Sequence, residues 1–262
     1  MVKPMEVSKI KTLTPYQDIN DVLVLLTQGA KGVLGNDLVG LYLTGSLTYG
    51  DFNLESSDID FLAVMKKELS PEKLEEIKAM HKTIGQAFPK WARRIEGSYI
   101  TEAMLNEEET PKNPRPYVNE GKVSSYVYGN EWTLNLYVLY ECGIALYGPD
   151  PKDYFKPVSI EKVREASKRD LLEEWEPKLK DESFFKNSHY KAYLILTLCR
   201  ILHRANSTKV ASKKVASTWT KEEYPQWKDL IETAENWKHG VEFDRAQEVK
   251  EFIKFTIEKV GH

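Results

Sequence analysis

The sequence predicts an α+β protein: a mixed β-sheet flanked by helices in residues 1–130, followed by an all-α helical bundle in residues 131–262. Two observations predict this division. The first half contains short apolar runs bounded by glycine and charged residues, which are typical of buried strands. The second half contains apolar stripes at helical spacing throughout. We see no internal repeat or low-complexity tract that would indicate another architecture.

The composition is that of an ordinary globular protein of 262 residues, with a formal charge of -3 and a pI near 6.0. This charge argues against attraction of the whole protein to nucleic acid or to anionic membranes. The two cysteines, Cys142 and Cys199, lie in apolar helical patterns and suit packed thiols in a reducing compartment. No signal peptide or membrane-spanning run is visible. We therefore expect a cytoplasmic, monomeric protein. We expect it to bind neither a membrane nor, stably, a nucleic acid.

The first elements are a helix and two strands. Residues 14–34 predict the helix, because apolar side chains recur there at helical spacing and Gly35 follows as a stop. Residues 38–44 form an apolar run that predicts the first strand, and residues 59–65 predict the second. Between the two strands lies a polar, glycine-containing passage, which we interpret as a loop.

A helix and a third strand follow. Residues 70–88 predict the helix, since Ser70 can cap it and proline is tolerated at its first position. His81 lies near its apolar stripe and is expected to be a surface or packed histidine. Residues 93–100 predict the third strand, with Glu96 in its interior. Residues 101–130 predict either a long loop or a set of short strands.

The remaining chain is predicted to be helical. Each segment has apolar residues at helical spacing, and a glycine-proline stop at residues 148–149 ends the first of them. The predicted helices are residues 132–146, 158–179, 184–204, 207–219, 224–237 and 243–260. Together they predict a compact helical bundle.

Two aspartates at the start of the second strand carry the clearest chemical signal. Asp58 and Asp60 are two residues apart, so that on a strand their side chains point to the same face. Their mutual repulsion requires a compensating positive charge. A divalent cation supplies it, and hard oxygen ligands with positions open to phosphate suit Mg²⁺. Taken singly, each residue could instead be an ordinary turn, cap or strand-start residue.

The order of these features resembles the signature of the polymerase β nucleotidyltransferase superfamily, Gly-Ser followed by Asp-x-Asp. The resemblance implies that Gly45 and Ser46 hold the triphosphate of ATP, the co-substrate, and that Asp58 and Asp60 hold magnesium. It further implies that Glu96, from the next strand, is the general base or a further metal ligand. The alternative for Glu96 is an edge-strand glutamate paired with a neighbouring arginine.

Three segments of the second half, residues 145–149, 196–200 and 209–219, narrow the resemblance. They are similar to the aminoglycoside adenylyltransferases that act on streptomycin and spectinomycin, enzymes of antibiotic resistance. The resemblance implies that Lys213 binds the nucleotide phosphates and that Arg200, near an interdomain cleft, is a further nucleotide-binding residue. The acceptor is expected in that cleft. Both side chains could also be solvated helix charges.

Two departures from the family pattern bear on the acceptor. Residues 119–122 lack the tryptophan that the family supplies to the drug pocket, and residues 186–190 lack its acidic cluster. The guanidinium groups of streptomycin favour such carboxylates. The sequence therefore favours spectinomycin over streptomycin.

The expected function is transfer of AMP from ATP to a hydroxyl of an aminoglycoside-type antibiotic, with release of pyrophosphate. One alternative is a nucleotidyltransferase that modifies a protein or tRNA, as an antitoxin-type enzyme does. Another is a nucleotide-binding module without catalysis. A plain helical interaction protein would leave Asp58, Asp60 and Glu96 unexplained.

Overall fold

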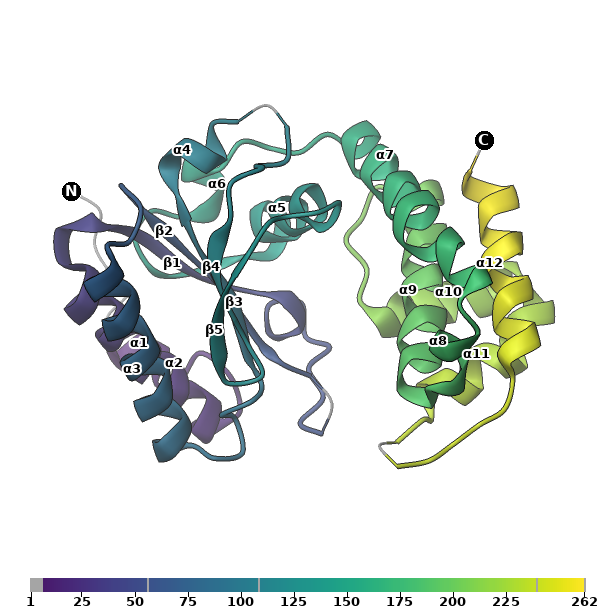
Figure 1. The fold of residues 1–262 in the computed structure, drawn as a ribbon, viewed down its shortest axis with the longest axis horizontal. Helices are drawn as coiled ribbons and strands as arrows, with labels where there is room; N and C mark the ends of the chain where they lie inside the picture. The colour runs from purple at the N-terminus through teal and green to yellow at the C-terminus, as the bar shows by residue number, and fades with distance from the viewer. Residues whose placement is uncertain (1–6, 56, 108, 239, 262) are drawn as a thin grey trace. The chain divides into compact units, whose positions relative to one another are not determined.

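The computed structural model describes residues 7–55, 57–107, 109–238 and 240–261. The chain divides into two compact units, Met1–Pro157 and Val158–His262. The first unit contains the sheet and the second is helical (Figure 1). The predicted fold class, a mixed sheet with flanking helices followed by a helical bundle, is confirmed.

The first unit is built on one mixed sheet. Its strands are β1 (Leu38–Thr44), β2 (Ile59–Met65), β3 (Ile95–Thr101), β4 (Arg115–Asn119), β5 (Lys122–Tyr126) and β6 (Ile144–Tyr147). Its helices are α1 (Val7–Ile10), α2 (Gln17–Leu34), α3 (Pro71–Ala87), α4 (Glu102–Leu105), α5 (Glu131–Cys142) and α6 (Pro151–Tyr154). Two 3₁₀ turns, η1 (Gly35–Asp37) and η2 (Gly45–Leu47), flank β1.

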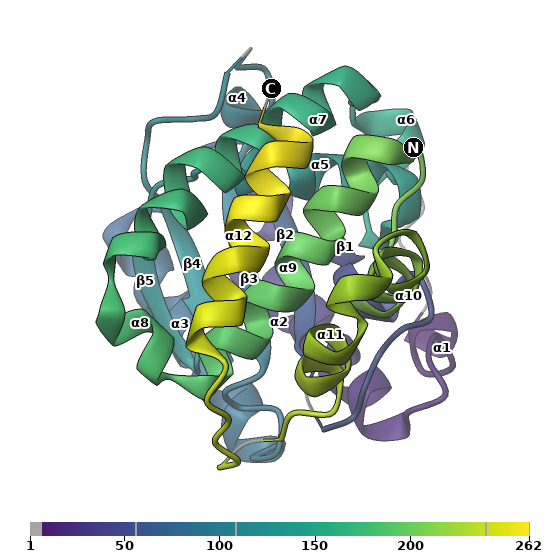
Figure 2. The same cartoon turned by 90° about the vertical axis from the view of Figure 1, so that its right-hand side faces the viewer.

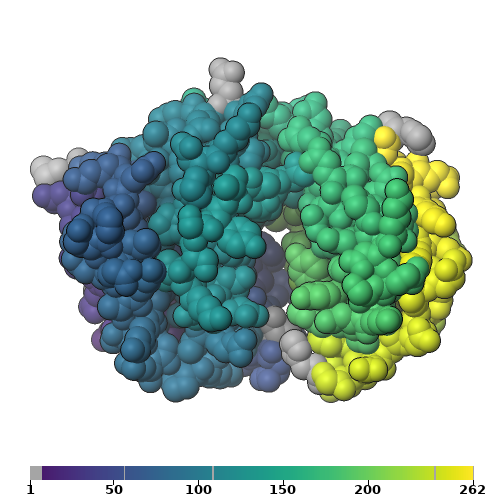
Figure 3. Space-filling view, viewed as in Figure 1, coloured from purple at the N-terminus to yellow at the C-terminus, as the bar shows by residue number. Residues whose placement is uncertain are grey.

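The strand order of the sheet is β5-β4-β3-β2-β1-β6. Strands β2 and β3 are parallel because α3 connects them, and the other neighbours are antiparallel. The three long strands β1, β2 and β3 therefore lie side by side, and the β4–β5 hairpin extends the sheet beyond β3. This hairpin lies at the surface of the first unit (teal in Figure 3).

The two faces of the sheet are covered by different helices. Helices α2 and α3 pack on one face, where Leu23, Leu41 and Trp91 are fully buried in one apolar cluster. Helix α5 packs on the other face through Trp132 and Leu139 (Figure 1). Because both faces contribute to the core, the apolar runs of β1 and β2 are nearly continuous.

The structure differs from the sequence expectation at residues 131–157. The sequence predicted a helix over residues 132–146 and a boundary after residue 130, but α5 ends at Cys142 and β6 then pairs with β1. Gly143 permits this exit, because a Cβ atom there would lie 2.3 Å from the carbonyl oxygen of Leu139. Since β6 completes the sheet, this segment belongs to the first unit.

The second unit is a bundle of helices (Figure 2). Its helices are α7 (Ile160–Asp170), α8 (Glu182–Lys186), α9 (Ser188–Asn206), α10 (Lys213–Glu223), α11 (Lys228–Glu235) and α12 (Ala246–Val260). A π-helical segment η3 (Leu171–Trp175) and a 3₁₀ segment η4 (Glu176–Lys180) lie between α7 and α8. A 3₁₀ turn η5 (Pro225–Trp227) lies between α10 and α11. Helix α9 contacts α7, α10, α11 and α12 and forms the centre of the bundle.

Two predicted helices of this half are interrupted in the structure. The segment 158–179 leaves α-geometry after Asp170, ahead of Pro177, which cannot donate a helical backbone hydrogen bond. The segment 184–204 is divided by Asn187, whose side chain accepts from the amide of Tyr190 and caps α9. Within the described residues, no helix has the length and hydropathy needed to cross a membrane.

His81, on α3, is buried against the sheet. Its side chain is 7% exposed, and Nε2 lies 2.9 Å from the hydroxyl of Tyr99 on β3. Burial lowers the pKa of His81 to about 4. The histidine is therefore neutral in the folded protein at neutral pH, and unfolding allows it to bind a proton at a higher pH.

We expect His81 to make the protein less stable in mild acid. The pKa of His81 is lower in the folded than in the unfolded state. Its contribution to the free energy of unfolding is therefore complete above the pKa of the unfolded state and is lost as the pH falls toward 4. Between pH 7.5 and pH 5 the loss is about 2 kcal/mol. Urea unfolding of wild type, His81→Gln and the exposed-site control His189→Gln measures it. An equal pH dependence in all three proteins would contradict the assignment.

Candidate active site

The end of β1 leads into the turn that the sequence predicts as the phosphate-binding element. Strand β1 ends at Thr44, and Gly45 then adopts a φ of 70° at the start of η2. A Cβ atom at this position would lie 2.0 Å from Oδ2 of Asp60. Glycine is therefore required both by the backbone and by the carboxylate that packs against it. Ser46 follows in the same turn and is half-buried.

The strand register brings two of the predicted carboxylates together. Asp60 on β2 pairs with Thr44 on β1 and with Glu96 on β3. Cross-strand partners point to the same face of a sheet, so Asp60 and Glu96 are direct neighbours. Asp58 comes two residues before Asp60, just ahead of β2. Gly45, Asp60 and Glu96 thus meet where the ends of β1, β2 and β3 lie side by side. Asp58 lies just ahead of β2.

Arg94, which the sequence reasoning did not single out, binds the loop that carries Asp58. Its guanidinium donates to the carbonyl oxygen of Leu54 at 2.7 Å and to that of Ser57. Its Nε lies 3.8 Å from a carboxylate oxygen of Asp58, and the group stacks 4.6 Å from the ring centre of Trp91. One side chain therefore links two carbonyl groups and a candidate metal ligand.

Tyr117 on β4 is a second site residue that the sequence reasoning missed. Its hydroxyl donates a hydrogen bond to Oε1 of Glu96. Burial, followed by the charge of Glu96, raises the pKa of Tyr117 above its ordinary value. The hydroxyl therefore stays protonated and remains a donor. Because residues 101–130 were interpreted as a loop or short strands without a register, the sequence could not show that Tyr117 faces Glu96.

The carboxylates fit a magnesium ion that arrives with phosphate ligands. Among the described residues, no group of three or more His, Cys, Asp or Glu side chains is arranged to hold a metal ion. Asp58 and Asp60 offer two carboxylates, and Mg²⁺ is commonly bound by one or two carboxylates together with water and substrate phosphates. The donor set therefore suits a metal that is completed by a nucleotide and not a closed protein site.

The other two predicted nucleotide-binding residues lie in the second unit. Lys213 is the first residue of α10, and its Nζ lies 4.8 Å from the ring centre of Tyr193. Arg200 lies on α9, and its buried Nε has no hydrogen-bond partner among the described residues. The roles of Lys213 and Arg200 in nucleotide binding stay predictions.

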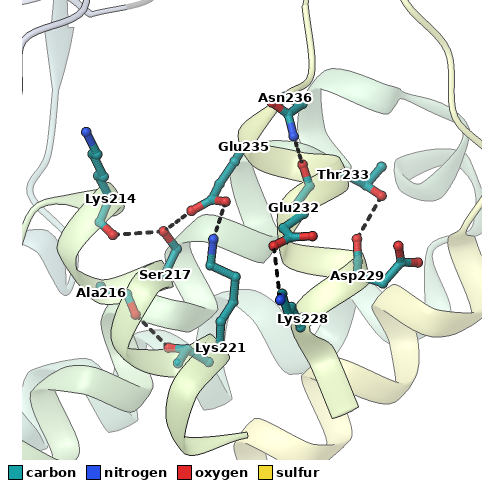
Figure 4. A network of polar contacts seen from close by, with 11 residues as sticks. Lys214, Ala216, Ser217, Lys221, Lys228, Asp229, Glu232, Thr233, Glu235 and Asn236 are labelled. Atoms are coloured by element: carbon teal, nitrogen blue, oxygen red, sulfur yellow. Dashed lines mark hydrogen bonds and ion pairs between the residues drawn. The ribbon is translucent and has the colours of Figure 1, made fainter. Parts of the chain in front are cut away.

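Helix α10 is tied to α11 by a small polar network (Figure 4). The hydroxyl of Ser217 donates to Glu235 at 2.5 Å, and Nζ of Lys221 lies 2.6 Å from the other oxygen of the same carboxylate. Ser217 is fully buried, so the carboxylate of Glu235 satisfies a hydroxyl that water cannot reach. The network fixes the orientation of the helix that begins at Lys213.

Comparison with known proteins identifies relatives for both units. A model of the aminoglycoside adenylyltransferase C-terminal domain matches residues 153–260. Spectinomycin 9-adenylyltransferase of Staphylococcus aureus is 27% identical over 201 residues, 72% of this chain and 73% of the relative. Spectinomycin 9-adenylyltransferase of Enterococcus faecalis is 26% identical over 229 residues, 81% of this chain and 82% of the relative.

This chain is similar to the aminoglycoside adenylyltransferases. The resemblance predicted from the sequence is thereby confirmed. A crystal structure of the spectinomycin adenyltransferase AAD(9) from Enterococcus faecalis with ATP and spectinomycin has the same fold, with a TM-score of 0.73. That match covers 92% of this chain and 99% of the other at 20% sequence identity.

We expect Arg94 to hold the loop before Asp58 in place. In Arg94→Lys, the ammonium group cannot reproduce the geometry in which the guanidinium donates to the carbonyl oxygens of Leu54 and Ser57 at the same time. Loss of one such hydrogen bond should speed amide exchange in this loop, at residues such as Ser57, by about 10-fold. Hydrogen exchange followed by mass spectrometry measures it.

Arg93→Lys is the matched control for this experiment. The Arg93 side chain is 75% exposed and pairs with the exposed Glu120, so its replacement should leave exchange in the loop unchanged. Equal exchange rates in the two variants would show that Arg94 does not restrain the loop.

Proposed function

We propose that this chain transfers AMP from ATP to a hydroxyl group of spectinomycin and releases pyrophosphate. The observation that carries the proposal is the meeting of Gly45, Asp60 and Glu96 at the ends of three neighbouring strands. This arrangement combines a turn that phosphate can approach closely with two neighbouring carboxylates. Asp60 packs against the turn, and Glu96 accepts a hydrogen bond from Tyr117. The names of the relatives support the acceptor, since two of them are spectinomycin 9-adenylyltransferases.

In the proposed reaction, Glu96 accepts the proton of the acceptor hydroxyl. The hydroxyl oxygen then forms a bond to the α-phosphorus of ATP, and the bond from that phosphorus to the pyrophosphate oxygen breaks. A carboxylate is suited to this task because it can accept a proton in the transition state. The β2–β3 pairing supports the assignment, because it places Glu96 beside Asp60.

Asp58 and Asp60 would hold magnesium in this reaction. When bound, the ion supplies positive charge that neutralises the phosphate oxygens. The contact between Gly45 and Asp60 supports this role, because it places the carboxylate next to the turn that would hold the phosphates. Ser46, the next residue of the turn, would donate its hydroxyl to a phosphate oxygen. We place the reaction in the cytoplasm, where ATP is available.

Spectinomycin is favoured over streptomycin by the side chains at the start of α9. No carboxylate that could pair with a guanidinium group is present in residues 186–190. The acceptor hydroxyl of spectinomycin requires only a proton acceptor and a properly placed phosphorus. The chemistry assigned to the first unit is therefore compatible with a sugar-like acceptor that has no guanidinium group.

We expect magnesium-dependent release of pyrophosphate from ATP in the presence of spectinomycin. Asp60→Asn and Glu96→Gln should each lower kcat/KM at least about 100-fold, the usual scale for loss of a general base or a metal ligand. Glu120→Gln is the control, because this carboxylate is exposed on the β4–β5 turn. A coupled pyrophosphate assay across spectinomycin, streptomycin and other aminoglycosides makes the comparison.

The same assay separates the competing functions. Absence of release with every antibiotic, while ATP still binds with magnesium, would rule out the proposed activity. Labelling of a protein or tRNA with AMP would then indicate a macromolecular acceptor. Nucleotide binding without any product would indicate a binding module.

We also expect Gly45→Ala to weaken binding of magnesium-ATP at least about 10-fold, because the new Cβ displaces the Asp60 carboxylate. Gly50→Ala is a close control, since Gly50 has a φ of 76° but nothing within 4 Å of its Cβ position. Both variants carry similar backbone strain, so the difference between them isolates the contact with Asp60. Titration calorimetry measures the affinities, and equal affinities in the two variants would contradict the proposed role of the turn.

A further inference from the structure

Tyr117 is linked to Glu96 across two antiparallel strands. Tyr117 on β4 pairs with Ser98 on β3, and Glu96 lies two residues before Ser98 on the same face. The tyrosine hydroxyl reaches this diagonal neighbour and donates to Oε1. One oxygen of the Glu96 carboxylate is therefore held by a protein donor.

The ring of Tyr117 is itself restrained by its neighbours. Arg115, two residues earlier on the same face of β4, is only 4% exposed, and its Nε donates to Oγ of Ser98 at 3.2 Å. Its guanidinium lies 5.1 Å from the ring centre of Tyr117 and 3.5 Å from that of Tyr128. The ring of Tyr126 lies 5.9 Å away. The ring of Tyr117 thus lies beside a buried cation and a second aromatic ring.

Glu96 needs such a restraint because of its other neighbour. Asp60 lies directly opposite it on β2, and like charges at cross-strand positions repel one another. Glutamate also has more rotatable bonds than aspartate, so the repulsion alone would turn its carboxylate away from the site. A neutral donor on the far side holds one oxygen without neutralising the charge that a base requires.

We propose that Tyr117 is a positioning residue for Glu96, holding Oε1 so that Oε2 is presented to the acceptor hydroxyl. The inference rests on the proposed function, in which Glu96 is the general base. Arg115 supports Tyr117 through its contact with the ring. Tyr117 acts through Glu96 and does not itself exchange a proton with the substrate.

The test is a double-mutant cycle in the pyrophosphate assay with the full chain. Tyr117→Phe should lower kcat by about 10- to 100-fold, the scale of a hydrogen bond to a charged group. The KM values for ATP and spectinomycin should change by less than about 2-fold, because the hydroxyl acts on the base and not on substrate binding. In a Glu96→Ala background, the same substitution should cause no further loss.

Tyr126→Phe is the matched control, because it keeps the ring that lies beside Tyr117 and removes only the hydroxyl of a tyrosine that is 60% exposed. Its kcat should equal that of wild type. Urea unfolding of the same four proteins of the cycle supplies a readout without activity: Tyr117→Phe should be destabilising only when Glu96 is present.

The outcomes separate this inference from the proposed function. Wild-type activity with an unchanged kcat in Tyr117→Phe overturns the inference alone, as does a loss of equal size in the Glu96→Ala background. Equal destabilisation with and without Glu96 also overturns it. Wild type that is inactive with every acceptor overturns the proposed function, and the role of Tyr117 with it.

Discussion

The pairing of β2 with a neighbour on each side is the constraint on which the candidate site depends. Its antiparallel register with β1 places Asp60 opposite Thr44, at the entrance to the Gly45 turn, and its parallel register with β3 places Asp60 opposite Glu96. A shift of one residue in either pair would turn the carboxylate to the opposite face. The apolar residues of β2 pack on both faces of the sheet, and a shift would disrupt all of these packing contacts. The core of the sheet therefore determines the geometry of the charged groups at the ends of its central strands.

The part of this arrangement that depends on local pattern could be predicted from the sequence. The two apolar runs around a Gly-Ser turn and an Asp-x-Asp pair predicted β1, β2 and the α+β class, and the structure has them at the same residues. Glu96 was identified because a charge inside a strand requires an explanation. The structure then shows Glu96 beside Asp60, but its catalytic role, like those of Asp58, Asp60, Gly45, Ser46, Lys213 and Arg200, stays a prediction.

What the sequence could not supply was the pairing of distant segments. Strand β6 is an apolar run that also fits a helix, and only the open edge of β1 decides between the two. Tyr117 lies 21 positions after Glu96, and nothing in a linear pattern indicates that the β4 register brings them together. Arg94 contacts backbone carbonyl groups, which carry no residue-specific signal at all. Each omission thus concerns a contact set by tertiary register and not by composition.

The outer position of β5 has a consequence for how the protein behaves at high concentration. A terminal strand exposes one row of backbone donors and acceptors, which another chain can extend into an intermolecular sheet. Strand β5 is only five residues long, carries Lys122 at its start and has two serines in its middle. These features disfavour strand addition from another molecule. The hairpin that supplies Tyr117 to the site therefore presents an edge that is a poor template for strand addition.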